Sequence, residues 1–101
     1  MKIYISGPIT GTDDYMDRFA KMEEELKKEG WIVVNPARVN AQLPEQTTHK
    51  EYMMTSLAML EMCDAIVMQE EWETSKGCEL EFEYAVEHKI AILFEGGRLN
   101  G

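Results

Sequence analysis

Basic side chains are scarce in this chain of 101 residues. Ten lysines and arginines stand against 19 aspartates and glutamates, which gives a formal net charge of -9 at pH 7, and the bases form no cluster. A polyanion would meet a repulsive field, so the composition argues against DNA or RNA as a partner. A small nucleotide remains compatible with this charge, because backbone amides at a helix N-terminus can hold a single phosphate.

Metal ligands and long apolar runs are scarce as well. The cysteines Cys63 and Cys78 and the histidines His49 and His88 lack metal-ligand spacing, so we expect no metal and no cofactor. Two unpaired thiols fit a reducing, cytoplasmic compartment. No apolar run approaches the roughly 20 residues of a membrane span. The first residues, MKIYISG, enter a strand pattern directly, and we therefore expect neither a signal peptide nor membrane association.

What is present is an alternation of short apolar segments with amphipathic ones. Buried strands are predicted at residues 2–5, 31–34, 65–68 and 90–94. Helices are predicted between them at about residues 13–29, 49–62 and 75–87. Residues 36–50 are predicted to form a long polar loop, and the tail EGGRLNG is predicted to add no further element.

This order of elements predicts a single α/β domain over residues 1–101. We expect a small flavodoxin-like, three-layer domain, in which helices cover both faces of a four-stranded parallel sheet of order 2-1-3-4. In such a sheet a ligand binds outside the carboxyl ends of the first and third strands, where the strand order reverses. The loops that border this crevice span residues 6–12 and 69–77, so both are candidate binding loops.

Several residues of these loops have both a structural and a functional interpretation. Ser75 can cap the third helix or bind a substrate phosphate or hydroxyl. Gly7 and Gly77 can serve turn geometry or let a ligand approach the backbone. Trp72 can stack on a base or cover the core. Tyr4, late in the first strand, is apolar enough for the core, but its hydroxyl needs a partner if it is buried.

The segment SKGCELE, residues 75–81, places two glutamates at the start of the third helix. On a helical wheel the side chains that face the core are Cys78, Phe82, Ala85 and Val86, and those that face solvent are Glu79, Glu83 and Glu87. Glu81 lies at the edge of the buried stripe, toward the crevice. There it can act as a nucleophile or an acid/base group, or remain a half-buried acid bonded to nearby amides.

The second helix is apolar on almost every side. Residues 52–62 read YMMTSLAMLEM, and a sheet that covers one side of a helix leaves the other side free for polar residues. Either the protein has a methionine-rich core, or a second subunit covers this helix. We expect a homodimer or a larger homo-oligomer formed through helix 52–62.

Five stretches of the chain carry a resemblance to a known group of proteins: YISGPITG, VVNPA, YMMTSLAMLEMCDAIVM, W-x-x-S-x-G-x-x-x-E and IAILFE. They resemble small phage and bacterial domains of unknown function allied to the nucleoside 2-deoxyribosyltransferase superfamily. The likeness spans nearly the whole chain, and its most specific part is W-x-x-S-x-G-x-x-x-E. It implies cleavage of an N-glycosidic bond, or base exchange, on a 2-deoxynucleoside or its 5′-monophosphate.

The resemblance also implies roles for individual residues. Glu81 stands at the position of the nucleophile, which attacks the anomeric carbon before water or a second base takes the sugar. Tyr4 would orient Glu81, and Ser56 stands where many active relatives have an aspartate that assists the leaving base. Pro8 and Thr10 replace a serine and an arginine of the monophosphate hydrolases. The residues implied to contact the substrate are Gly7, Pro8, Ile9, Thr10, Asn35, Trp72, Ser75 and Gly77.

A second class of function fits the same residues. A nucleotide-binding accessory or sensor module without turnover would use the same crevice and the same helix start. A phospho-receiver domain fits less well, because the third strand ends in Met68 and Gln69, where a receiver would carry an acceptor aspartate.

Overall fold

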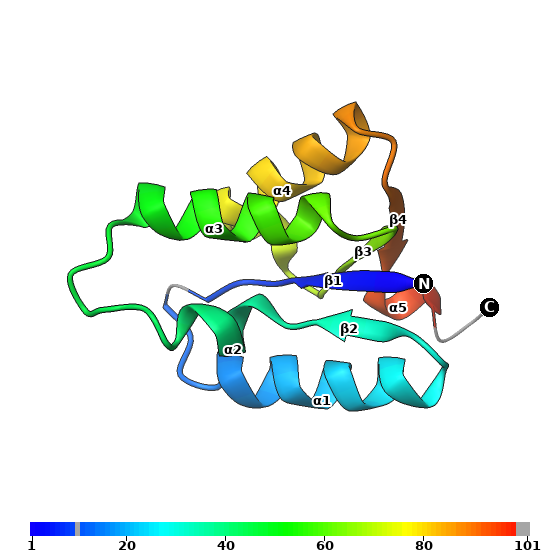
Figure 1. Cartoon of the computed structure of the whole chain (residues 1–101). Helices are drawn as coiled ribbons and strands as arrows, with labels where there is room; N and C mark the ends of the chain where they lie inside the picture. Colours follow the sequence, from blue (N-terminus) through cyan, green and yellow to red (C-terminus); the bar gives the residue numbers. More distant parts are fainter. Residues whose placement is uncertain (10, 99–101) are drawn as a thin grey trace.

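The structure is a computed structural model, and it describes residues 1–9 and 11–98, with the side chain of residue 98 excepted (Figure 1). Four strands form the sheet: β1 (Lys2–Ser6), β2 (Ile32–Val34), β3 (Ala65–Met68) and β4 (Ala91–Phe94). The helical elements are α1 (Tyr15–Lys28), α2 (Pro36–Asn40), α3 (His49–Glu61), η1 (Trp72–Thr74), α4 (Lys76–Glu87) and α5 (Glu95–Arg98).

The sheet has the predicted topology. All three strand pairings are parallel and the strand order is β2-β1-β3-β4, so the expected α/β fold of order 2-1-3-4 is confirmed. Tyr4 lies between Val34 of β2 and Ile66 of β3 in the register of the central strand. The carboxyl ends of β1 and β3 therefore meet side by side, where a sheet of this type binds ligands.

Helices cover both faces of the sheet, with α1 and α2 on one side and α3 and α4 on the other (Figure 1). Side chains alternate along each strand, so Ile3 and Ile5 pack against α1, while Tyr4 packs against α3 and α4. This alternation points the Tyr4 hydroxyl toward the layer that carries Glu81.

Two segments predicted to lack secondary structure contain short helices. Helix α2 begins inside the expected 36–50 loop because Asn35 caps it: its Oδ1 atom accepts from the amides of Ala37 and Arg38, and Pro36 occupies the first turn. Helix α5 forms at the start of the tail, where Glu95 Oε1 accepts from the amide of Glu70 at 2.9 Å.

Burial differs from the prediction at the margins of the sheet. The outer strands β2 and β4 were expected to be covered on both faces, yet Ile32 is 59% exposed and Phe94 is 46% exposed, because each lies on an edge strand. Val86 was expected to face the core and is instead 56% exposed. The buried stripe of α4 is narrower than the wheel predicted and contains Cys78, Glu81 and Ala85.

No helix in the described part of the chain has the length and apolar character that crossing a membrane requires.

Candidate active site

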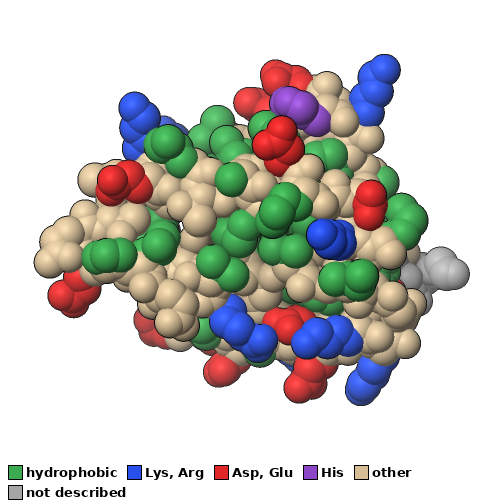
Figure 2. Space-filling view, viewed as in Figure 1, with side chains coloured by type: hydrophobic (Ala, Val, Ile, Leu, Met, Phe, Trp, Pro, Cys, Tyr) green, Lys and Arg blue, Asp and Glu red, His purple; other side chains and the backbone are tan. Residues whose placement is uncertain are grey.

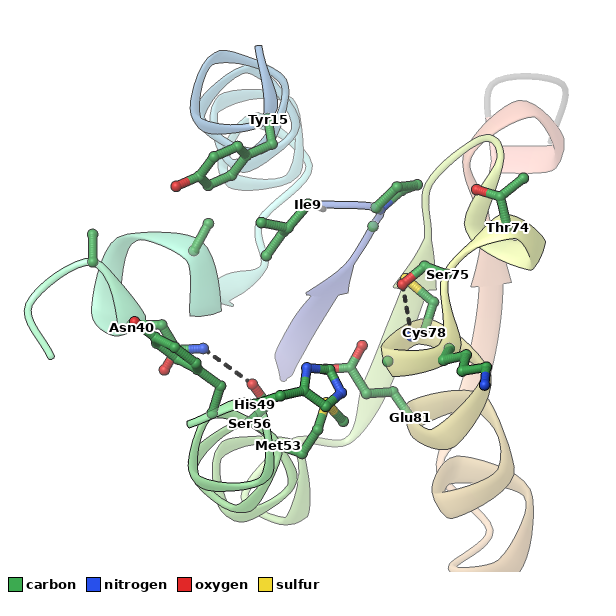
Figure 3. Close-up of a pocket in the computed structure, with 17 residues that line it drawn as sticks. Ile9, Tyr15, Asn40, His49, Met53, Ser56, Thr74, Ser75, Cys78 and Glu81 are labelled. Atoms are coloured by element: carbon green, nitrogen blue, oxygen red, sulfur yellow. Dashed lines mark hydrogen bonds between the residues drawn. The ribbon is translucent and has the colours of Figure 1, made fainter. Parts of the chain in front are cut away.

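A cavity of about 790 Å³ opens at the carboxyl end of the sheet (Figure 3). Its walls come mainly from the loop after β1, α2, the inner side of α3 and the first turns of α4, with Tyr15 of α1 and Thr74 of η1 beside them. The volume lies within the range of small-molecule sites. The fold therefore provides a ligand-sized hollow at the edge of the sheet where the strand order reverses.

The carboxylate of Glu81 reaches this cavity from the second turn of α4 and is only 7% exposed. Two hydroxyls of β1 hold it: Tyr4 Oη donates to Oε2, and Ser6 Oγ donates to Oε1 at 2.6 Å. Burial raises the pKa of Glu81 to about 7, although the bonds from Ser6 and Tyr4 each lower it. A carboxylate with this pKa changes its charge near neutral pH and is fixed in orientation at both oxygens.

A hydrogen-bond network continues behind Glu81. Burial and the nearby carboxylate raise the pKa of Tyr4 well above its ordinary value, while a hydrogen bond with Ser56 lowers it. Asn40 Nδ2 in turn donates to Ser56 Oγ at 3.1 Å (Figure 3). An ionised carboxylate only accepts hydrogen bonds, so Tyr4 donates to Glu81, and the amide group of Asn40 donates to Ser56.

The start of α4 forms another wall. Ser75 caps the helix, with its Oγ atom accepting from the amide of Cys78 at 3.3 Å, and it also lines the cavity. Gly77 lies close to Met53: an added Cβ would stand 3.3 Å from the Met53 sulfur. The Cys78 thiol also lines this wall, and burial raises its pKa. Because Ser75 lines the cavity while it caps α4, its capping role is compatible with contact to a ligand.

Most of the residues predicted to contact a substrate lie around this cavity. Those that line it are Gly7, Pro8, Ile9, Ser56, Ser75, Gly77 and Glu81, while Tyr4 reaches it through its bond to Glu81. Thr10 lies outside the described residues.

Two predicted contacts have other partners in the fold. Asn35 caps α2 and donates to Glu23 Oε1 at 3.0 Å, and its side chain does not line the cavity. The ring of Trp72 stacks on Phe82 with centroids 4.8 Å apart and meets Phe94 at 6.3 Å. Of the two interpretations of Trp72, the structure favours the one in which it covers the core.

Several residues of the site were not singled out from the sequence. The most important of them is Ser6, which donates to Glu81 but does not itself line the cavity. Strand alternation could have predicted the role of Ser6, because it lies two residues after Tyr4 in β1 and therefore faces the same side of the sheet. No sequence pattern predicted that α2 and the loop after it would reach the cavity. The lining residues that were not predicted include Tyr15, Asn40, Tyr52 and Met53.

No metal site accompanies the cavity in the described residues, which contain no group of three or more His, Cys, Asp or Glu side chains placed to hold an ion.

Gly7 has a packing role that an alanine substitution tests. An added Cβ would stand 1.9 Å from Gln69 Oε1, and the Gln69 side chain is buried, with Nε2 donating to the carbonyl of Arg18 at 3.3 Å. We expect Gly7→Ala to lower the free energy of unfolding by about 1–3 kcal/mol. Urea denaturation measures this change. Gly97→Ala is the control, because nothing lies within 4 Å of its added Cβ; equal losses in the two variants would contradict the prediction.

Comparison with solved structures defines the class of this fold. A 2-deoxyribosyltransferase from the psychrotolerant bacterium Bacillus psychrosaccharolyticus is similar, with a TM-score of 0.73 over 93% of this chain and 71% of that chain. The two sequences are 15% identical, so the likeness establishes the fold. The chain belongs to the family described as Domain of unknown function (DUF4406), whose model matches residues 1–94. No curated protein matches it in sequence. The prediction of a domain of unknown function with the fold of a 2-deoxyribosyltransferase is thereby confirmed.

Proposed function

We propose that this protein cleaves or exchanges the N-glycosidic bond of a 2-deoxynucleoside or its 5′-monophosphate, with Glu81 as the nucleophile. The observation that carries the proposal is a buried carboxylate, held by two hydroxyls, at a cavity large enough for a nucleoside. The fold that this chain shares with a 2-deoxyribosyltransferase supports the same chemistry. A fold alone hosts many functions, so the carboxylate and its geometry are the stronger argument.

In the first step an oxygen of the Glu81 carboxylate attacks the anomeric carbon. A bond forms between this oxygen and C1′, the bond between C1′ and the base nitrogen breaks, and its electron pair leaves with the base, which takes up a proton. Tyr4 and Ser6 orient the carboxylate, because each donates to one of its two oxygens. These two bonds fix the orientation of the carboxylate of Glu81, which lines the cavity.

In the second step water or another base attacks C1′ from the open side of the cavity. The ester bond to Glu81 breaks, its electron pair returns to the carboxylate, and the attacking group loses a proton. Ser75 and Gly77 are proposed to contact the 5′ end of the sugar, since both line the wall at the start of α4. Ser56 is proposed to face the leaving base, where its hydrogen bond from Asn40 fixes its direction.

Incubation with a panel of substrates tests the proposal. The panel contains the 2-deoxynucleosides and their 5′-monophosphates, each with and without an added acceptor base, and chromatography measures released base and new nucleoside. Base release without acceptor indicates hydrolysis, and a new nucleoside formed with acceptor indicates transfer. The matching ribonucleosides serve as controls for the 2-deoxy sugar.

Binding without turnover would overturn the proposal. If calorimetry detects a nucleotide bound to the chain while chromatography detects no free base, the protein is a nucleotide-binding module of the second class. If neither binding nor release is found with any member of the panel, the assignment to nucleosides is wrong.

A further inference from the structure

The outer side of α3 exposes three apolar residues together with charged ones, Lys50 and Glu51 at its start and Glu61 at its end. Met54 is 63% exposed, Ala58 is exposed, and Met62, directly after the helix, is 58% exposed. Lys50 and Glu61, near the two ends of the helix, are also exposed. We call Met54, Ala58, Met62, Lys50 and Glu61 the α3 stripe. Figure 2 shows hydrophobic side chains gathered across the face of the molecule that carries α3.

The fold itself does not require this stripe to be apolar. The inner side of α3 supplies its buried residues, Ser56, Met59 and Leu60, and half-buried Leu57 also packs toward the core. Helix α1 offers a comparison within the same chain, because all of its exposed positions except Met16 in the first turn are charged: Asp17, Lys21, Glu24, Lys27 and Lys28. A helix that faces only water follows the pattern of α1, so the α3 stripe indicates a contact surface.

The charges of the stripe indicate which partner fits. Lys50 and Glu61 are eleven residues apart in the sequence, which is about three helical turns, so they lie on nearly the same line along the helix, roughly 16 Å apart. If two copies of α3 pack antiparallel about a two-fold axis, Lys50 of each copy meets Glu61 of the other. The same register brings Met54 of each copy close to Ala58 of the other, near the centre. A parallel arrangement would instead place like charges together.

We propose that a second copy of this chain covers the α3 stripe, in an antiparallel pairing about a two-fold axis. A two-fold interface uses the same surface on both partners, and this stripe is complementary to itself in charge and apolar in its middle. The opposite side of the same helix contributes Tyr52, Met53 and Ser56 to the cavity. Pairing would therefore also fix the wall of the site, while the pairing itself does not depend on the proposed chemistry.

Charge reversal tests the pairing in the full-length chain. Sedimentation equilibrium is expected to show a dimer for the wild type. Each of the single variants Lys50→Glu and Glu61→Lys sets two like-charge pairs across the interface, and we expect each to raise the dimer dissociation constant by about tenfold or more. The double variant Lys50→Glu/Glu61→Lys restores both pairs in reversed order, and its dissociation constant is expected to return close to that of the wild type.

The control is Lys21→Glu, which makes the same charge change on the exposed side of α1 and is expected to leave the dissociation constant unchanged. Circular dichroism establishes that each variant remains folded. A wild type that sediments as a monomer would overturn the proposal. So would a double variant that associates no better than the two single variants, or single variants that behave like Lys21→Glu.

Discussion

Glu81→Gln is expected to reduce base release by about 10³-fold or more relative to the wild type. The amide keeps the size of the side chain and an oxygen that can accept from Tyr4 or Ser6, but a neutral amide oxygen is too weak a nucleophile to attack C1′. Chromatography of the released base under single-turnover conditions measures the effect. Trapping of the sugar on the protein, followed by intact mass, is expected for the wild type and absent for the variant.

The matched control for this variant is Glu79→Gln. Glu79 lies two residues earlier in α4 and is exposed, so the same chemical change there removes a solvated acid. Its activity is expected to match that of the wild type. If Glu81→Gln retained the activity of this control, Glu81 would not be the nucleophile.

Folding stability separates lost chemistry from lost structure. The folded-state pKa of Glu81 is raised to about 7 from 4.5, so its contribution to the free energy of unfolding falls as pH rises from 4.5 through 7. Ionisation of this buried group costs about 3 kcal/mol at higher pH. The Glu81→Gln variant avoids that cost, so its midpoint of urea unfolding at pH 8 is expected to be no lower than that of the wild type.

Base release is expected to rise with pH through about 7, the pKa of Glu81. Only the ionised carboxylate attacks, so the single-turnover rate should fall by about tenfold for each pH unit below that value and reach a plateau above it. A single-turnover rate that does not change between about pH 5 and pH 8 would contradict the assignment of Glu81 as a nucleophile with a raised pKa.

The Ser6→Ala variant identifies the group that titrates. The bond from Ser6 Oγ favours the ionised form of Glu81, so its loss is expected to move the midpoint of the pH profile upward. Thr55→Ala is the control, since the Thr55 hydroxyl donates to the carbonyl of Glu51 and does not line the cavity. An unchanged midpoint in Ser6→Ala would mean that another group controls the profile.

The elements with the strongest local patterns were predicted closely. Helix α3 has a capping box in which Thr48 and Glu51 bond to each other's backbone amides, and its apolar residues follow directly, so its start was visible in the sequence. The strands β1 and β3 are short apolar segments with helices before or after them. Their parallel order followed from that alternation, because crossover connections of one hand leave few arrangements.

Helix α2 was missed, although its start also has a local signal. Asn35 followed by Pro36 is a typical helix N-terminus, but the polar residues after it gave no apolar period to extend. Its position matters, because Asn40 at its end donates to Ser56 at the cavity. This contact joins residues sixteen positions apart, so the pattern of residues around Asn40 or around Ser56 does not predict it.

By itself, the sequence determined the order of strands and helices and, through helical phase, that Glu79 faces solvent while Glu81 lies at the edge of the buried stripe. Both follow from local periodicity, which is written in the spacing of apolar residues along one segment. Only the tertiary structure decided that Tyr4 and Ser6 of β1 meet the two oxygens of Glu81, more than seventy residues later in the chain. The tertiary structure also decides the raised pKa of Glu81, because the burial that causes it exists only when sheet, helices and loops together enclose the carboxylate.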